Sequence, residues 1–91
     1  DPFPTRYNLD QNYPNPFNPG TNISFQILEP GYVTLKVYDL LGRELATLVN
    51  EEKIRGNYEI PFNGSGFSSG LYFYILNWNN SIQTKKMLLI K

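Results

Sequence analysis

The side chains of this sequence best suited to acid–base chemistry are carboxylates, because its 91 residues contain neither histidine nor cysteine. A Ser-His-Asp triad, a thiolate nucleophile and a disulfide framework are therefore excluded. The candidate acids are Asp10, Glu29, Asp39, Glu44, Glu51, Glu52 and Glu59. Glu51 and Glu52 are adjacent, and sequence neighbours do not flank a substrate as an acid–base pair does. We expect no catalytic residue and no enzyme activity.

A metal or cofactor site is not indicated by the remaining polar residues. Histidine and cysteine, the usual zinc ligands, are absent. Asp10 lies among asparagines that could offer oxygen ligands to calcium, but their spacing does not match a calcium loop. Asparagine beside proline is typical of turns instead. We expect no metal and no cofactor.

Aromatic rings are a further group that could bind a ligand. Tyr32, Tyr58, Tyr74 and Trp78 could stack on sugar rings. Such rings more often pack in a core or pair across strands, which is our main interpretation. Carbohydrate binding stays open as an alternative.

The charges point to neither nucleic acid nor membrane. Net charge is zero, which removes the simplest case for binding polyanions. After Glu59 the only charged residues are Lys85, Lys86 and Lys91, so the end of the chain is locally basic. Lysines of this kind commonly keep a strand edge soluble. No run approaches the roughly 20 apolar residues that a membrane-spanning helix needs.

The first 20 residues differ from the rest. Five of the seven prolines lie there, mixed with asparagines, and proline fixes φ and removes a donor, which predicts an extended, loop-like segment. We assign residues 1–8 to a linker from an upstream domain, since Asp1 is not a natural first residue, and residues 9–91 to one domain. Leu9, Tyr13 and Phe17 are expected to dock on its core.

From Thr21 onward apolar residues recur at every second position, as in half-buried strands. We predict strands at 22–28, 32–38, 58–62, 71–78 and 81–90, a strand or helical turn at 44–49, and a charged loop at 50–55. Residues 71–78 are almost entirely apolar, which favours a strand buried on both faces. Asn79 and Asn80 fit a two-residue hairpin turn. Short strands without a credible long helix predict an all-β sandwich.

Four motifs, in order, resemble the type A C-terminal sorting domain of the type IX secretion system of Bacteroidetes. They are YPNPFNP at 13–19 with Thr21, Ile23 and Phe25 behind it, VTLKVYDLLGR at 33–43, SGLYFY at 69–74, and KKMLLIK at 85–91. One departure is Phe62-Asn63-Gly64, where the family commonly has Trp-Asp-Gly. Asparagine can form the same turn as aspartate, so the resemblance holds.

This resemblance implies an immunoglobulin-like β-sandwich of about seven antiparallel strands without catalytic activity. It implies a signal that directs a larger exported protein through the type IX system to the cell surface or the medium. The implied partners are the outer-membrane translocon and its shuttle proteins, a sortase that cuts upstream and attaches the cargo to the surface, and the cargo domain of the same precursor.

Given the resemblance, Lys85, Lys86 and Lys91 are the leading candidates for recognition by the translocon, read along a strand edge by main-chain pairing. Gly70 and Tyr72 are further candidates, although a glycine at a turn and a tyrosine in the core is the plainer interpretation. We interpret Asp39 and Arg43 as architecture around a turn.

Two other classes of function stay open. One is an accessory immunoglobulin-like module that binds carbohydrate or acts as a spacer. The other is a self-association module.

Overall fold

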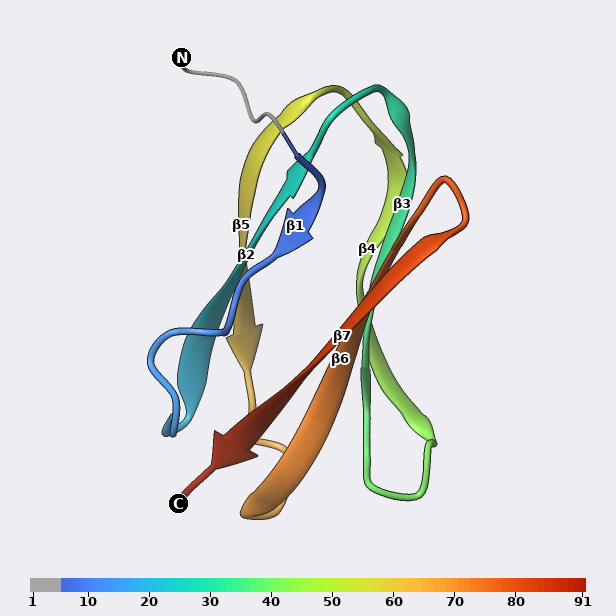
Figure 1. Cartoon of the computed structure of the whole chain (residues 1–91). Helices are drawn as coiled ribbons and strands as arrows, with labels where there is room; N and C mark the ends of the chain where they lie inside the picture. Colours follow the sequence, from blue (N-terminus) through green and yellow to red (C-terminus); the bar gives the residue numbers. More distant parts are fainter. Residues whose placement is uncertain (1–5) are drawn as a thin grey trace.

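The computed structural model describes residues 6–91, which form seven strands and no helix. The strands are β1 (Asn8–Leu9), β2 (Gly20–Ile27), β3 (Gly31–Tyr38), β4 (Glu44–Lys53), β5 (Gly56–Asn63), β6 (Gly70–Trp78) and β7 (Ser81–Leu89). They form two packed sheets, β1-β2-β5 and β4-β3-β6-β7, in which all neighbouring strands are antiparallel (Figure 1). The all-β prediction is confirmed. Within this described part, no helix is long and apolar enough to cross a membrane.

The strand order is that of an immunoglobulin-like sandwich. Strands β1, β2 and β5 take the A, B and E positions, and β3, β6 and β7 take C, F and G. Strand β4 lies beside β3, where variable-type domains carry an additional C′ strand. The predicted sandwich of about seven antiparallel strands is confirmed.

Alternate residues of β2 and β3 form the centre of the core. The fully buried ones are Ile23, Phe25, Ile27, Val33, Leu35 and Val37. Because successive strand residues point to opposite faces, the alternation of apolar and polar residues in the sequence is sufficient to place them. Tyr74 and Leu76 from β6 and Met87 and Leu89 from β7 join the same cluster.

The proline-rich segment before β2 packs on the core through two of its three predicted residues. Leu9 and Phe17 are buried, whereas Tyr13 is 80% exposed, so the prediction for Tyr13 is wrong. The neighbouring Asn12 is the residue that turns inward, where its side chain donates to Thr21 Oγ1 at 3.0 Å. Neighbours along an extended chain point to opposite sides, and Tyr13 therefore faces water.

Part of the predicted linker contacts the sandwich. Residues 1–5 of it lie outside the described residues. Asn8 of β1 pairs with Gln26 of β2, and the ring of Tyr7 lies 5.1 Å from that of Trp78. The Tyr7 hydroxyl donates to the carbonyl of Leu76 at 2.9 Å. The division into linker and domain stays a prediction, but contacts with the sandwich already begin at Tyr7.

Strand β4 differs from its prediction. Residues 50–53, predicted as a charged loop, continue the strand that starts at Glu44. The register between β3 and β4 shifts twice, so that Leu45 and Leu48 are extra residues without a partner in β3. Such bulges break the period of two. This is why the sequence fitted a strand and a helical turn equally well.

Strand β6 is central in its sheet, as predicted, but it is not buried on both faces. Leu71, Phe73 and Ile75 point away from the core and are only half-buried. The described residues place no third layer over this outer face (Figure 1). The prediction of double burial is therefore wrong. The outward-facing apolar residues of β6 are partly covered by side chains of the neighbouring strands and not by another layer.

The chain enters at one end of the sandwich and leaves at the other (Figure 1). Tyr7 lies next to Ser81 at the β6–β7 turn, where its hydroxyl donates to the Ser81 carbonyl at 3.1 Å. Lys91 lies beside Ser69, in the loop between β5 and β6 at the opposite end. The longest dimension of the molecule is 38 Å.

Candidate recognition site

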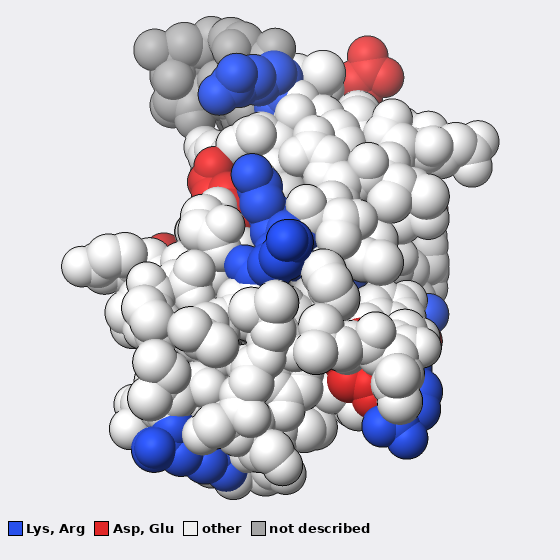
Figure 2. Space-filling view, turned by 60° about the horizontal axis from the view of Figure 1, so that its bottom comes forward, with Lys and Arg blue, Asp and Glu red and all other residues white. Residues whose placement is uncertain are grey.

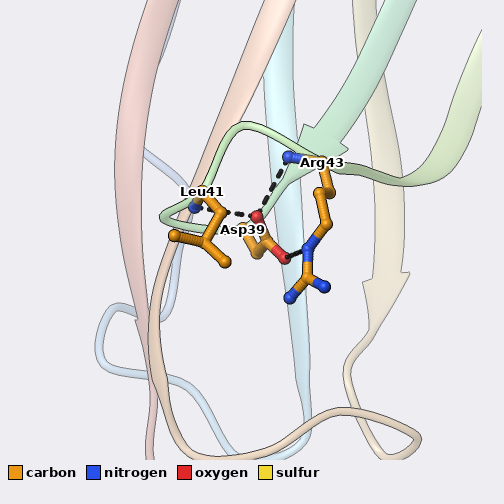
Figure 3. Close-up of polar contacts among 3 residues, drawn as sticks. All are labelled: Asp39, Leu41 and Arg43. Atoms are coloured by element: carbon orange, nitrogen blue, oxygen red, sulfur yellow. Dashed lines mark hydrogen bonds and ion pairs between the residues drawn. The ribbon is translucent and has the colours of Figure 1, made fainter.

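The turn between β3 and β4, residues 39–43, is fixed by the carboxylate of Asp39 (Figure 3). Its Oδ1 accepts from the backbone N–H of Leu41 at 2.9 Å and of Arg43 at 3.0 Å. Its Oδ2 accepts from Arg43 Nε at 2.7 Å. Gly42 has a φ of 81°, which glycine adopts without strain. Asp39 and Arg43 therefore hold the turn closed, in agreement with their interpretation as architecture.

These bonds also set the charge of Asp39. The backbone N–H of Arg43 lowers the pKa of Asp39 below its ordinary value of 3.8, and the Arg43 side chain and the Leu41 N–H lower it further. A carboxylate that accepts several bonds is stabilised in its charged form. Asp39 is therefore charged over the whole neutral range of pH.

The closed turn holds two leucines in water. Leu40 is 62% and Leu41 78% exposed. These two adjacent leucines form a small exposed apolar patch on an ordered turn. Our reading of the sequence missed these leucines. The signal was the run Asp-Leu-Leu-Gly, in which two apolar residues stand between two turn-forming ones.

Gly70 and Tyr72 lie beside this turn. A shallow cavity of about 230 Å³ separates them from it, lined by Asp39, Leu40, Leu41, Arg43, Ser69, Gly70, Leu71 and Tyr72. Gly70 has a φ of 154°, and a Cβ there would meet no atom, so glycine is needed for the backbone and not for space. The Tyr72 hydroxyl donates to the carbonyl of Ser68 at 2.6 Å. Both residues shape the wall of the cavity.

Lys91 belongs to the same region. Its Nζ donates to the carbonyl of Ser65 at 2.6 Å, and its backbone N–H donates to Ser69 Oγ at 2.9 Å. We refer to the turn 39–43, the loop 64–70 with Tyr72, and residues 89–91 as the C-terminal end of the sandwich. Three of the five candidate residues, Gly70, Tyr72 and Lys91, lie there.

Lys85 and Lys86 lie elsewhere, in the middle of β7. They pair with Tyr74 and Phe73 of β6, and as consecutive strand residues they point to opposite sides of the sheet. Figure 2, which brings the C-terminal end forward, shows Lys and Arg side chains in separate patches on a largely uncharged surface. The basic stretch of the sequence is therefore divided in space.

The edge of β7 near its end is covered by the proline-rich segment. The backbone N–H of Phe17 donates to the carbonyl of Leu88 at 2.9 Å, and that of Ile90 donates to the carbonyl of Phe17 at 3.0 Å. The N–H of Leu88 donates to the side chain of Asn15 at 2.9 Å. A receptor strand could pair with this part of β7 only after displacing that segment.

The acidic residues take structural positions. Asp10 accepts from the side chains of Asn8 at 2.6 Å and Gln26 at 3.1 Å. Glu44 forms an ion pair with Lys36 at 3.2 Å, and this partner lowers the pKa of Glu44. Among residues 6–91, no three or more His, Cys, Asp or Glu gather as metal ligands.

Of the four aromatic rings that could stack on sugars, three pack within the protein. Tyr74 and Trp78 are buried. The ring of Tyr58 stacks on that of Phe25 at 5.3 Å, with Lys53 Nζ 4.9 Å above it. Tyr32 is the exception, since half of it is exposed.

The fold defines a class of protein: an immunoglobulin-like β-sandwich module that carries exposed apolar residues on the turn 39–43. Its sequence matches the family described as the secretion system C-terminal sorting domain over residues 11–91. The chain belongs to this family. It is a C-terminal secretion signal of the type IX system, which marks proteins for export across the outer membrane to the cell surface or the medium.

The fold is similar to part of PorZ, an essential bacterial surface component of the type IX secretion system of Porphyromonas gingivalis. The TM-score is 0.58 at 22% sequence identity, and the match covers 93% of this chain but 11% of PorZ. At this identity the likeness supports the fold alone. A comparison with curated proteins finds no match.

Proposed function

We propose that the secretion machinery recognises this domain at the C-terminal end of the sandwich. The observation that carries the proposal is the convergence of three separate sequence motifs. The turn 39–43 ends the second motif, Gly70 and Tyr72 belong to the third, and Lys91 closes the fourth. They surround one shallow cavity or lie beside it.

The chemistry of this end suits a receptor with an apolar pocket. Burying a leucine side chain contributes roughly 1.5–3 kcal/mol. The backbone that carries Leu40 and Leu41 is fixed before binding by the bonds of Asp39, so little backbone entropy is lost on contact. The Arg43 side chain is 72% exposed beside them. Arg43 and Lys91 together favour a receptor with acidic groups around its apolar pocket. Such complementary charges speed association and orient the two partners.

Lys85 and Lys86 are retained as a second, separate contact. They lie along β7, and a receptor that covers the C-terminal end and extends up this strand would reach them. Main-chain pairing with the end of β7 is a poorer mode of recognition, because Phe17 already occupies that edge.

The finer roles follow from the family and are proposals for this chain. The receptors are the outer-membrane translocon and its shuttle proteins, a sortase acts on the segment before the domain, and the cargo is an upstream domain of the same precursor. The cargo is then attached to the cell surface. We also propose that the domain itself has no catalytic role, which is supported by the engagement of Asp10, Asp39 and Glu44 in amide, turn and ion-pair contacts.

The test is export of a reporter fused ahead of the domain, in a host with a type IX system. Leu40→Ser with Leu41→Ser removes the apolar patch and leaves Asp39 and Gly42 in place. The matched control is Ile54→Ser with Ile82→Ser, because these residues are similarly exposed, at 73% and 63%, and lie at the opposite end. We expect export to fall at least tenfold for the first variant and to stay at the wild-type level for the control.

Circular dichroism and denaturant unfolding of the purified domains show whether both variants remain folded. Wild-type export of the leucine variant would contradict recognition at this end. An equal loss in both variants would show that exposed apolar residues in general, and not this patch, determine export.

A further inference from the structure

A hollow lies on the outer face of the four-stranded sheet, remote from the C-terminal end. It has a volume of about 370 Å³ and is lined by Tyr32, Thr34, Asn77, Asn79 and Asn80. Tyr32 lies at the start of β3 and Tyr38 at its end, so roughly 20 Å of strand separates this hollow from the turn 39–43. The two sites are therefore independent.

Tyr32 provides an apolar platform with a fixed position. Its hydroxyl donates to Asn50 Oδ1 at 2.6 Å. Asn50 pairs with Thr34, two residues further along the same face, so the ring is drawn along the sheet rather than standing out into water. Half of Tyr32 nevertheless remains exposed. An ordered ring with free surface is suited to stacking against another apolar surface.

Amide side chains surround this ring. Asn77 pairs with Thr34 on the same face and is exposed. Asn79 and Asn80 have φ values of 48° and 65°, which fix the tight turn that carries them. Each carboxamide offers both a donor and an acceptor, and the threonine hydroxyl does the same. The rim therefore bonds hydroxyl groups in either direction.

The charge around the hollow selects against anionic ligands. None of its lining residues is charged. Glu52 pairs with Tyr32 from β4 and adds a carboxylate on this side, which repels anions. The uncharged lining fits a neutral polyol, which offers an apolar C–H face to the ring and hydroxyl groups to the amides and the carboxylate.

We propose that Tyr32, Thr34, Asn77, Asn79 and Asn80 form a binding site for an uncharged pyranose residue of a glycan. The sugar ring stacks on Tyr32, and its hydroxyl groups bond to the asparagine amides. A single exposed ring in a shallow hollow supports a Kd of about 1 mM for one sugar unit. This site does not depend on how the domain is recognised for export.

The test is an NMR titration of the 91-residue chain with methyl glycosides of glucose, galactose, mannose, rhamnose and N-acetylglucosamine, and with cellohexaose and xylohexaose. We expect saturable amide shifts confined to residues 31–34, 50–52 and 77–80 for at least one of these probes. Glucuronic acid should bind more weakly than glucose because of Glu52.

Tyr32→Ala removes the platform, and we expect at least a tenfold loss of affinity. Tyr32→Phe keeps the ring and loses only the bond to Asn50, so it should retain most of the binding. Tyr13→Ala is the matched control, because Tyr13 is an exposed tyrosine outside the hollow, and binding should be unchanged. Three outcomes would overturn the site: no saturable shift with any probe, undiminished binding by Tyr32→Ala, or equal loss in Tyr13→Ala.

Discussion

The backbone N–H of Phe17 donates to the carbonyl of Leu88 at 2.9 Å, which joins the proline-rich segment to the last strand of the sandwich. The side chain of Phe17 is buried in the same place. The last strand is thus an internal part of the fold at this point and not a free edge. Recognition through side chains at the C-terminal end is therefore a better proposal than pairing with the backbone of β7.

The facing core residues of β2 and β3 should dominate stability. Phe25→Ala and Leu35→Ala each remove a side chain with no exposed surface, and we expect either change to lower the free energy of unfolding by about 2–5 kcal/mol. Denaturant unfolding measures this, with the exposed Leu41→Ala as control. Wild-type midpoints for both core variants would show that these side chains do not carry the core.

Asp39 should make the domain more sensitive to acid. Its pKa is lowered in the folded state by bonds from Arg43 and Leu41, so its contribution to stability is present above its ordinary value of 3.8. That contribution is lost as the pH falls through the depressed folded pKa. In Asp39→Asn, the side-chain oxygen can still accept from the N–H groups of Leu41 and Arg43, but the residue carries no charge. This variant should therefore lose less stability on acidification. Thermal unfolding at pH 7, 4 and 2.5 compares the two proteins. Parallel losses of Tm would contradict a charged role for Asp39.

Tyr74 should govern the response to alkali. Its hydroxyl donates to the carbonyl of Asp10 and accepts from the N–H of Asn12, both at 2.7 Å. Tyr74→Phe leaves both groups unpaired and should cost about 1–3 kcal/mol at pH 7. Burial raises the pKa of Tyr74 from 10.0 to about 12, so its contribution is complete below pH 10 and is lost as the pH rises through 12.

The stability gap between wild type and Tyr74→Phe should therefore narrow between pH 10 and 12. Urea unfolding at pH 7, 10 and 11.5 measures it. Tyr7, whose pKa burial also raises to about 12, is present in both proteins and affects them equally. A gap that is constant over this range would show that Tyr74 does not titrate with unfolding.

The effect of the three lysines on export can be measured separately from their effect on stability. Replacing Lys85, Lys86 and Lys91 by Gln keeps the apolar contacts of β7, and the free energy of unfolding should change by no more than about 0.5 kcal/mol. We expect a reporter fused ahead of this variant to be exported poorly although the domain is folded. Because Lys91 lies at the C-terminal end and the other two do not, Lys91→Gln alone should account for most of the defect. Normal export of the triple variant would exclude recognition by charge.

The sequence predicted the fold correctly where apolar residues alternate with a period of two and no other period fits. In β2 and β3 the apolar residues alternate without interruption, and all six inward residues lie in the core. In β4 the bulges at Leu45 and Leu48 place extra residues in the strand, and bulges follow from pairing with β3, which local sequence does not contain. The exposure of Tyr13 depends in the same way on a long-range contact, the bond from the Asn12 N–H to the Tyr74 hydroxyl that turns Asn12 inward.

The candidate site was predictable only in part. Gly70, Tyr72 and Lys91 were named from the motifs and lie together, whereas Lys85 and Lys86, which share a motif with Lys91, lie elsewhere. An extended strand separates residues rapidly, at about 3.4 Å per position. The leucines at 40 and 41 were missed because alternation favours burial of apolar residues, and only the bonds of Asp39 show that this turn is ordered and open to water.

The opposite placement of Tyr7 and Lys91 has a consequence for modularity. A passenger fused ahead of Tyr7 would sit at the far end of a body 38 Å long, away from the turn 39–43 and the chain end. Under the proposed recognition at the C-terminal end, the length of the sandwich would keep a bulky passenger away from the receptor. One such tag could then serve passengers of different shapes, because the passenger and the receptor would lie at opposite ends of the domain.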